Sequence, residues 1–324
     1  MVSPIGLGCW QFSQSHGLGG KFWGMMTDDE ILAVVRVSLA GGINWFDTAE
    51  AYGWGASERA LARALKTLGQ APGKVVVATK WHPLFRTSRS IPKTVDTRIA
   101  CLGGYPIDLF QVHSPLSFSS IEAQMAAMAR LVEGQKIRAV GVSNFSARQM
   151  RKAHAALARR GLRLVSNQVR YSLLDRKIET NGVLDAAKEL GVSIIAYSPL
   201  AQGILSGKFH ADPSLIRRKP GFRKHMGAFK PRGLERSRPL IEALRGVAAM
   251  HGVTSSQVAL NWVAAIHGDS IVAIPGASTP AQAAENAGAL SFSLARQDVE
   301  LLDRLSRPPT CGSLRSRRSA SLPA

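Results

Sequence analysis

The sequence predicts a closed parallel (β/α)₈ barrel, and three observations lead to this fold class. Short apolar runs alternate with longer segments of helical periodicity along most of the chain. Eight such runs occur over roughly 300 residues, the usual scale of an eight-stranded barrel. No Gly-x-Gly-x-x-Gly turn follows the first run, which disfavours the alternative, an open doubly wound sheet.

Each predicted strand is a short apolar run that ends in a polar or small residue. The eight runs are Ile5–Cys9, Ile43–Phe46, Val75–Thr79, Leu109–Val112, Ala139–Val142, Leu164–Asn167, Ser193–Ala196 and Ile271–Ile274. The helices are predicted from apolar residues at helical spacing. They are Asp28–Ala40, Ser57–Leu68, Ile91–Leu102, Ile121–Gly134, Ala147–Arg160, Val183–Leu190, Ser255–His267, Pro280–Gly288 and Gln297–Leu305.

Two segments depart from this alternation. Residues 200–238 are glycine-rich, proline-containing and basic, and we expect a long loop after the seventh strand. Loops at the carboxyl ends of barrel strands build the active site. Residues 307–324 lack apolar periodicity and are predicted to be a disordered basic tail. Residues 1–306 then form one domain.

The composition is that of a globular protein, with 45% hydrophobic residues among 324. No apolar run is long enough for a membrane-spanning helix, and the start of the chain lacks the pattern of a secretory signal. The three cysteines, Cys9, Cys101 and Cys311, have neither disulfide-framework nor zinc spacing. These features predict a protein of the reducing cytoplasm without a membrane partner.

The formal net charge is +19, and much of it lies in three regions. They are Arg148–Lys177, Arg217–Arg245 and the tail from Arg307. Such a field attracts anions, including phosphorylated cofactors. Because no helix-turn-helix, zinc-finger or RNA-recognition signature accompanies it, we interpret it as a solvated basic surface, not a specific nucleic-acid site. The oligomeric state, monomer or homo-oligomer, stays open.

Four chemically active side chains follow three consecutive predicted strands. Asp47 and Tyr52 follow the second strand, Lys80 the third and His113 the fourth. Each alone has an ordinary structural interpretation: a turn cap for Asp47, a surface ammonium for Lys80, a structural imidazole for His113. Together, at one edge of a barrel, they indicate a shared site.

The chemistry of these groups indicates a proton donor for a carbonyl. A free phenol has a pKa near 10, and a neighbouring ammonium lowers it by favouring the phenolate. The carboxylate would keep Lys80 charged, and the imidazole would orient a substrate oxygen. We expect no metal site, because one His and one Asp are too few ligands, and no hydrolytic triad, because no nucleophilic Ser or Cys is placed beside His113.

With these motifs in order, the chain resembles the aldo-keto reductases from "IGLGCWQF" to about Leu305. The motifs are "FDTAEAYG", "ATK", "VHSP", "GVSNF", "NQVRYS", "AYSPLAQGILSGKF" and "IPGAST". Their form is most similar to the bacterial branch that includes general-stress and inositol-locus reductases. The resemblance implies reduction of a carbonyl with hydride from a nicotinamide cofactor, or the reverse. Tyr52 would be the general acid, tuned by Lys80 and Asp47, and His113 would orient the carbonyl.

The resemblance also implies a cofactor shell. Ser143, Asn144 and Gln168 would hold the carboxamide, and Tyr197 would stack on the nicotinamide ring. The residues expected along the pyrophosphate are Ser198, Leu200, Gln202, Gly203, Leu205 and Lys208. Those expected around the adenosine half are Gly276, Ser278, Thr279, Gln282, Glu285 and Asn286. NADP(H) is favoured. NAD(H) is the alternative, because no Lys or Arg lies between Gly276 and Asn286, where many members bind the 2′-phosphate.

Four tryptophans, Trp10, Trp23, Trp54 and Trp81, lie at or after the ends of the first three strands. We expect them to form the mouth of the pocket, where an apolar wall beside a polar corner suits aromatic or aliphatic aldehydes and ketones. Packing of the tryptophans under loops is the alternative.

Two other functions stay open. One is a nucleotide-binding regulatory or redox-sensing subunit, as in the potassium-channel β-subunits that the family includes. The other is a barrel of different chemistry, such as a metal hydrolase. Turnover of a simple aldehyde with a nicotinamide cofactor would separate them from a reductase.

Overall fold

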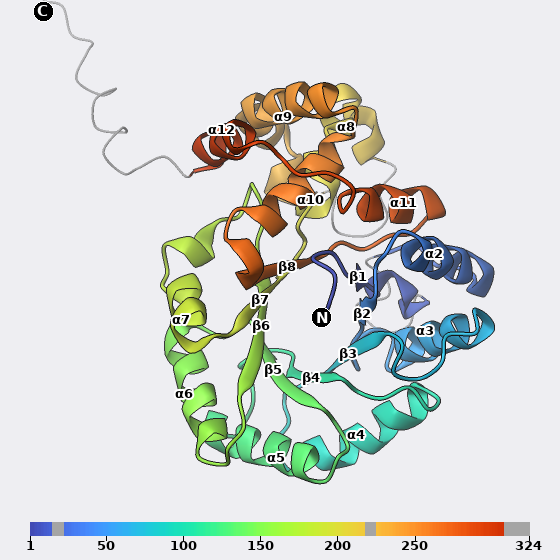
Figure 1. The fold of residues 1–324 in the computed structure, drawn as a ribbon, viewed down its shortest axis with the longest axis vertical. Coiled ribbons are helices and arrows are strands. Elements are labelled where there is room, and N and C mark those ends of the chain that lie inside the picture. Colours follow the sequence, from blue (N-terminus) through green and yellow to red (C-terminus); the bar gives the residue numbers. More distant parts are fainter. Residues whose placement is uncertain (15–22, 218–224, 308–324) are drawn as a thin grey trace, which may run out of the picture.

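The computed structural model describes residues 1–14, 23–217 and 225–307. Eight strands form one sheet in chain order, with every neighbouring pair parallel (Figure 1). They are β1 (Leu7–Gly8), β2 (Trp45–Asp47), β3 (Val76–Trp81), β4 (Leu109–Val112), β5 (Ala139–Ser143), β6 (Leu164–Arg170), β7 (Ser193–Tyr197) and β8 (Ile271–Ile274).

The sheet closes on itself between β8 and the start of the chain. Gly6 N donates to Ala273 O at 2.8 Å, Ala273 N donates to Pro4 O at 2.9 Å, and Gly8 N donates to Pro275 O at 3.0 Å. These parallel-type contacts join the two edges. The predicted (β/α)₈ barrel is therefore confirmed, and an open doubly wound sheet is excluded.

Helices follow the strands around the outside of the barrel. They are α2 (Asp28–Ala40), α3 (Ala56–Thr67), α4 (Ser90–Cys101), α5 (Ile121–Glu133), α6 (Ala147–Ala158), α7 (Val183–Leu190), α8 (Lys208–Ala211), α9 (Pro231–His251), α10 (Ser255–Ala265), α11 (Pro280–Gly288) and α12 (Arg296–Ser306). Three of them begin with reciprocal caps that the sequence encodes: Thr27 with Glu30, Ser146 with Gln149, and Thr254 with Gln257. Observed and predicted boundaries differ by two residues or fewer for every helix that was predicted.

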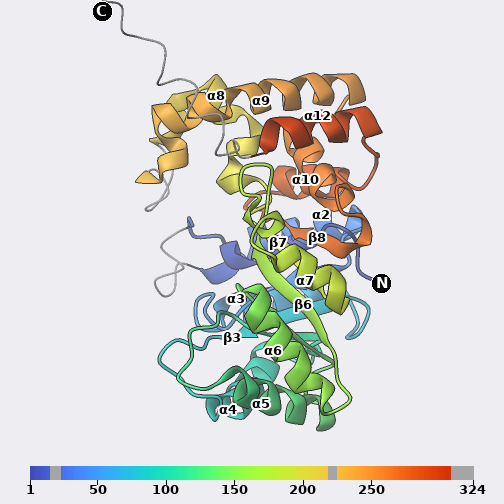
Figure 2. The same ribbon diagram turned by 90° about the vertical axis from the view of Figure 1, so that its left-hand side faces the viewer.

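The prediction of a loop over the whole of residues 200–238 is wrong. The segment forms the short 3₁₀ helix η3 (Ala201–Ser206), then α8, and the long helix α9 begins at Pro231. Helix α9 was missed because its arginines and Pro239 interrupt the pattern, although buried Leu234, Leu240 and Leu244 keep a helical spacing. Figure 2 shows α8, α9 and α12 gathered with α10 at one end of the molecule. Of the predicted tail, residues 307–324, all but Arg307 lie outside the described residues.

The strands separate two apolar regions. The larger core lies between the barrel wall and the helices and includes Phe46 and Phe110. A smaller cluster fills the barrel interior with Trp45, Ile195 and Ile274. Because side chains alternate along a strand, Trp45 and Asp47 share the inner face of β2. The interior is therefore apolar toward the bottom and polar at the carboxyl edge.

No helix among the described residues combines the length and the apolar character needed to cross a bilayer.

Candidate active site

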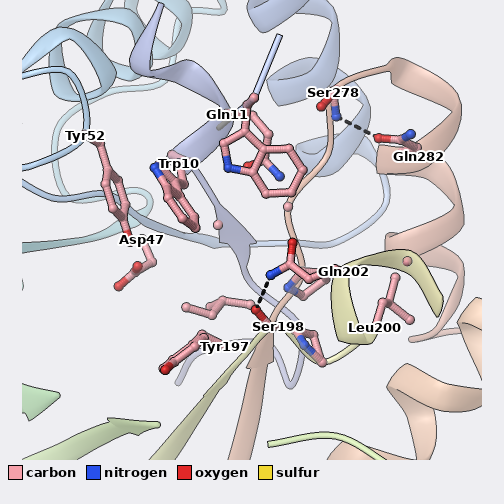
Figure 3. Close-up of a pocket in the computed structure, with 18 of the residues that line it drawn as sticks. Trp10, Gln11, Asp47, Tyr52, Tyr197, Ser198, Leu200, Gln202, Ser278 and Gln282 are labelled. Atoms are coloured by element: carbon pink, nitrogen blue, oxygen red, sulfur yellow. Dashed lines mark hydrogen bonds between the residues drawn. The ribbon is translucent and has the colours of Figure 1, made fainter. Parts of the chain in front are cut away.

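A cavity of about 1250 Å³ opens at the carboxyl ends of the strands, the edge at which barrels of this type carry their sites. In the close-up of Figure 3, Asp47 and Tyr52 lie at one end of the cavity and Ser278 and Gln282 at the other. The cavity is therefore elongated, and it joins groups that are far apart in the sequence.

Lys80 and Asp47 form a buried ion pair at the floor of this cavity. The Lys80 ammonium donates to Asp47 Oδ1 and, at 2.8 Å, to the carbonyl oxygen of Thr48. The other carboxylate oxygen accepts from the side-chain amides of Gln111 at 3.1 Å and Gln168 at 2.8 Å. Burial lowers the pKa of Lys80, but Asp47 and Tyr52 outweigh it, so the net pKa is raised and the ammonium stays charged.

Tyr52 lies above this pair, on the loop between β2 and α3. The Lys80 ammonium is 5.0 Å from the centroid of its ring, and Trp10 stacks on the ring at 5.8 Å (Figure 3). Burial raises the pKa of Tyr52 more than Lys80 lowers it, and Asp47 raises it further. The expected effect of Lys80 is present, because the ammonium lowers the pKa of Tyr52, but burial dominates and the net pKa is raised.

His113 follows β4 and faces the same corner. Its backbone N donates to Trp81 O at 3.0 Å, and its ring meets the Tyr52 ring edge-on at 5.7 Å. Burial, Lys80 and His82 hold the pKa of His113 well below its usual range. The imidazole is therefore neutral at pH 7, and its buried Nδ1 has no hydrogen-bond partner within the described chain.

The residues expected around a carboxamide form one connected group. Ser143 Oγ donates to Gln168 O at 2.9 Å, and Asn144 Nδ2 donates to Ser143 Oγ at 3.1 Å. The Tyr197 hydroxyl donates to Asn144 Oδ1 at 3.1 Å. All four residues line the cavity. The Gln168 side-chain amide also donates to Asp47 Oδ2, at 2.8 Å.

The segment after β7 supplies most of the group expected along a pyrophosphate. Ser198, Leu200, Gln202, Gly203 and Lys208 line the cavity, and Gln202 Nε2 donates to Ser198 Oγ at 3.1 Å (Figure 3). Leu205 does not line it. Its side chain is fully buried in the core of the barrel wall, so the expected contact is wrong.

The group expected around an adenosine lies at the far end. Gly276, Ser278, Gln282, Glu285 and Asn286 line the cavity there. The exception is Thr279, which is the N-cap of α11 and accepts from Gln282 N at 3.2 Å. Among the described residues that line the cavity, Lys208 is the one Lys or Arg.

Three of the four tryptophans lie where they were expected. Trp10, Trp23 and Trp54 line the cavity. Trp81 does not: it is fully buried and its Nε1 donates to Ser90 Oγ at 3.1 Å. Successive side chains of a strand point to opposite faces, so Lys80 enters the barrel and Trp81 packs under the helices.

Sequence reasoning missed Gln11, His82, Leu84 and Gln111, which lie at the site. The signal for Gln111 was available, because β4 pairs in register with β3 and places Gln111 beside Lys80. Gln11 Oε1 is buried at the cavity without a hydrogen-bond partner in the described chain. His82 and Leu84 lie on a loop, whose course the periodicity does not encode.

Taken together, the geometry provides a phenol hydroxyl beside a charged ammonium and a neutral imidazole, at one end of a long cleft lined by amides, hydroxyls and one lysine. It suits transfer of a proton to an oxygen atom of a small molecule held beside Tyr197. The described residues contain no group of three His, Cys, Asp or Glu side chains arranged to hold a metal ion.

Comparison with known sequences gives a match across the chain. A model of the Aldo/keto reductase family matches residues 4–307. An uncharacterized oxidoreductase of Mycobacterium tuberculosis is 38% identical over 301 residues, which cover 93% of this chain and 86% of the relative.

Solved structures give the same result. A glycerol dehydrogenase from Gluconobacter oxydans superposes with a TM-score of 0.79 and 26% identity, covering 96% of this chain and 94% of that one. An aldo/keto reductase from Klebsiella pneumoniae, in complex with NADP and acetate, superposes with a TM-score of 0.71 and 26% identity, covering 95% and 93%.

Proposed function

This chain belongs to the aldo/keto reductase family, and from that premise we propose that it is an NADP(H)-dependent oxidoreductase that reduces aldehyde or ketone carbonyls to alcohols, or runs the reverse reaction, in the cytoplasm. One observation supports this most: Tyr52 lies over the Lys80–Asp47 pair and against His113, at the end of the cavity that Tyr197 also lines.

Each residue of this corner has a different role in the reduction of the carbonyl. The neutral His113 donates a hydrogen bond to the carbonyl oxygen and orients it. Tyr52 gives its hydroxyl proton to the same oxygen as negative charge develops there. Lys80 stabilises the resulting phenolate, and Asp47 keeps Lys80 in place. The nicotinamide, when bound, supplies the hydride.

The cleft fits such a cofactor in shape and in chemistry. Asn144 and Ser143 offer amide and hydroxyl groups for a carboxamide, and the Tyr197 ring offers a face for stacking. Gln202 and Lys208 offer an amide and an ammonium for a pyrophosphate. Ser278 and Gln282 lie at the adenosine end. The NADP complex of the Klebsiella relative supports NADP(H); NAD(H) is the alternative, since Lys208 is the one Lys or Arg among the described residues that line the cleft.

Tryptophan fluorescence tests the cofactor directly, because Trp10, Trp23 and Trp54 line the cavity. We expect quenching on titration with NADPH at lower concentrations than with NADH. Tighter binding of NADH would reverse the cofactor assignment, and binding of neither would overturn the proposed function.

Turnover then separates the enzyme from a regulatory or redox-sensing subunit. We expect loss of NADPH absorbance with an aromatic aldehyde such as 4-nitrobenzaldehyde. Tight NADPH binding without any turnover would favour the regulatory alternative.

A further inference from the structure

Six rings line the substrate end of the cavity as a continuous chain of contacts. In order they are Trp23, Trp10, Tyr52, His113, His82 and Trp54. Neighbouring ring centroids lie between 5.7 and 6.1 Å apart, and Figure 3 shows the Trp10 and Tyr52 members side by side. Such a wall takes an apolar or aromatic body.

Two neighbouring members of this wall are imidazoles. His113 and His82 meet edge-on with their centroids 6.1 Å apart, and the proposed mechanism uses only His113. His82 lies one ring farther along the wall and packs edge-on against Trp54 at 6.0 Å. It therefore lies beside the place of the reacting oxygen and toward the mouth.

His82 is held in this position by its backbone. Its N donates to Glu50 Oε2 at 2.9 Å, and its carbonyl oxygen accepts from Arg86 Nη1 at 3.2 Å. Arg86 also donates to both oxygens of Glu50, at 2.8 and 2.9 Å. These contacts fix the backbone at His82 without using its ring nitrogens, and the ring contacts with His113 and Trp54 hold the imidazole at the cavity.

The charge state of both imidazoles selects the kind of oxygen they bind. Burial lowers the pKa of His82, and Arg86 lowers it further, against an opposite effect of Glu50. The pKa of His113 is lowered as well. Two neutral imidazoles offer one N–H each, which suits two uncharged oxygen atoms better than a carboxylate.

We propose that His82 is a second substrate-binding residue: its imidazole donates a hydrogen bond to an oxygen on the carbon next to the reacting carbonyl. The preferred substrates are then neutral 1,2-dicarbonyl and 2-hydroxycarbonyl compounds with an apolar or aromatic body. This inference rests on the proposed function, because His113 and Tyr52 are assigned the reacting oxygen there.

A matched pair of ketones tests it. The compounds 1-phenyl-1,2-propanedione and 1-phenyl-2-propanone differ by one oxygen, next to the carbonyl at C2. The two ketones differ in intrinsic reactivity, and this difference enters the ratio of their kcat/KM values. It is the same for both enzymes, so it cancels when the ratio for His82→Phe is compared with the ratio for the wild type. That variant keeps a ring against Trp54 and removes the N–H.

We expect the ratio to fall about tenfold in His82→Phe, the effect of losing one hydrogen bond, and to recover in part in His82→Gln, which restores a donor. His154→Phe, a matched change on α6 outside the barrel, should keep the wild-type ratio. An unchanged ratio in His82→Phe, with the variant folded and binding NADPH, would overturn the role of His82 and leave the proposed function intact. Absence of any carbonyl reduction by the wild type would overturn both.

Discussion

Lys80 and Asp47 form an ion pair from which solvent is excluded: their side chains are 0% and 1% exposed. The amides of Gln111 and Gln168 satisfy the second carboxylate oxygen. Breaking one member of such a pair leaves a buried charge without compensation, so the pair governs the stability of the barrel as well as the acidity of Tyr52.

Lys80→Met should therefore lose both activity and stability. We expect a cost of about 3–5 kcal/mol in the free energy of unfolding, together with a fall in kcat of roughly 100-fold or more. Urea unfolding and steady-state kinetics measure the two effects. Lys136→Met is the matched control: its pair with Asp96 is exposed, so its cost should stay below about 1 kcal/mol. Equal stability losses in the two variants would contradict the importance of burial.

Tyr52→Phe should remove the proton donor and little else. The hydroxyl is the only group deleted, so kcat should fall by about 10²–10⁴, while fluorescence titration should give a cofactor affinity near that of the wild type. Tyr105→Phe is the control, because its hydroxyl donates to Gln70 O at 2.6 Å far from the cavity. It should cost about 1 kcal/mol of stability and leave turnover intact. Near-normal turnover of Tyr52→Phe would refute the assigned role.

Stability should depend on pH through Glu58. Burial raises the pKa of this carboxyl from 4.5 to about 7, against the opposite effects of Arg98 and Thr79. Between pH 4.5 and about pH 7, the Glu58 carboxyl is protonated in the folded chain and mostly ionised in the unfolded chain. Stability from this group is thus present below about pH 4.5 and is lost as the pH rises through 7.

Urea unfolding at pH 5 and pH 8 measures this effect, which amounts to at most about 3 kcal/mol for the shift given. Glu58→Gln should reduce the difference between the two pH values, because the neutral amide does not titrate. Glu300→Gln, on the exposed surface of α12, should keep the wild-type difference. If Glu58→Gln also kept the wild-type difference in stability between pH 5 and pH 8, the raised pKa of Glu58 would be wrong.

The strand ends were the most predictable part of the site. Asp47, Lys80 and His113 follow three consecutive parallel strands, and parallel strands carry their carboxyl ends to one edge. It was harder to predict which side chains at and beyond the strand ends face the pocket. Trp81 was assigned to the pocket although its neighbour Lys80 enters the barrel, and two adjacent strand residues cannot face the same side.

The remaining errors come from tertiary packing. Thr279 follows the "IPGA" motif, but its hydroxyl caps α11, and Leu205 turns into the core after a kink at Gln202 and Gly203, where φ is positive. The net pKa of Tyr52 could not be predicted from the presence of Lys80, since burial depends on Trp10 and on other loops far away in the sequence.

Lys208 should contribute to cofactor binding and not to chemistry. Its ammonium is exposed at the part of the cleft where we propose that the pyrophosphate binds, and a charge-assisted hydrogen bond to phosphate contributes about 1.5–3 kcal/mol. Lys208→Met should raise the dissociation constant for NADPH about tenfold or more, with kcat at saturating NADPH near that of the wild type. Lys188→Met, on α7 outside the barrel, should bind NADPH normally. A large fall in kcat with unchanged affinity would place Lys208 elsewhere in the mechanism.

Gly276 should accept a side chain only if Gln11 moves, because Gln11 occupies the space beside it. A Cβ atom at this position would lie 2.0 Å from Gln11 Nε2 and 2.4 Å from its Oε1. Gln11 is 6% exposed and has the cavity on its other side, so the collision should drive its amide into the space where a cofactor would bind. Gly276→Ala should therefore weaken NADPH binding, measured by fluorescence, and lower the unfolding midpoint. Gly246→Ala is the control: a Cβ there meets nothing within 4 Å, and a helical Gly→Ala change should stabilise by about 0.4–1 kcal/mol. If Gly276→Ala bound NADPH as tightly as Gly246→Ala, Gln11 would not be confined as the structure indicates.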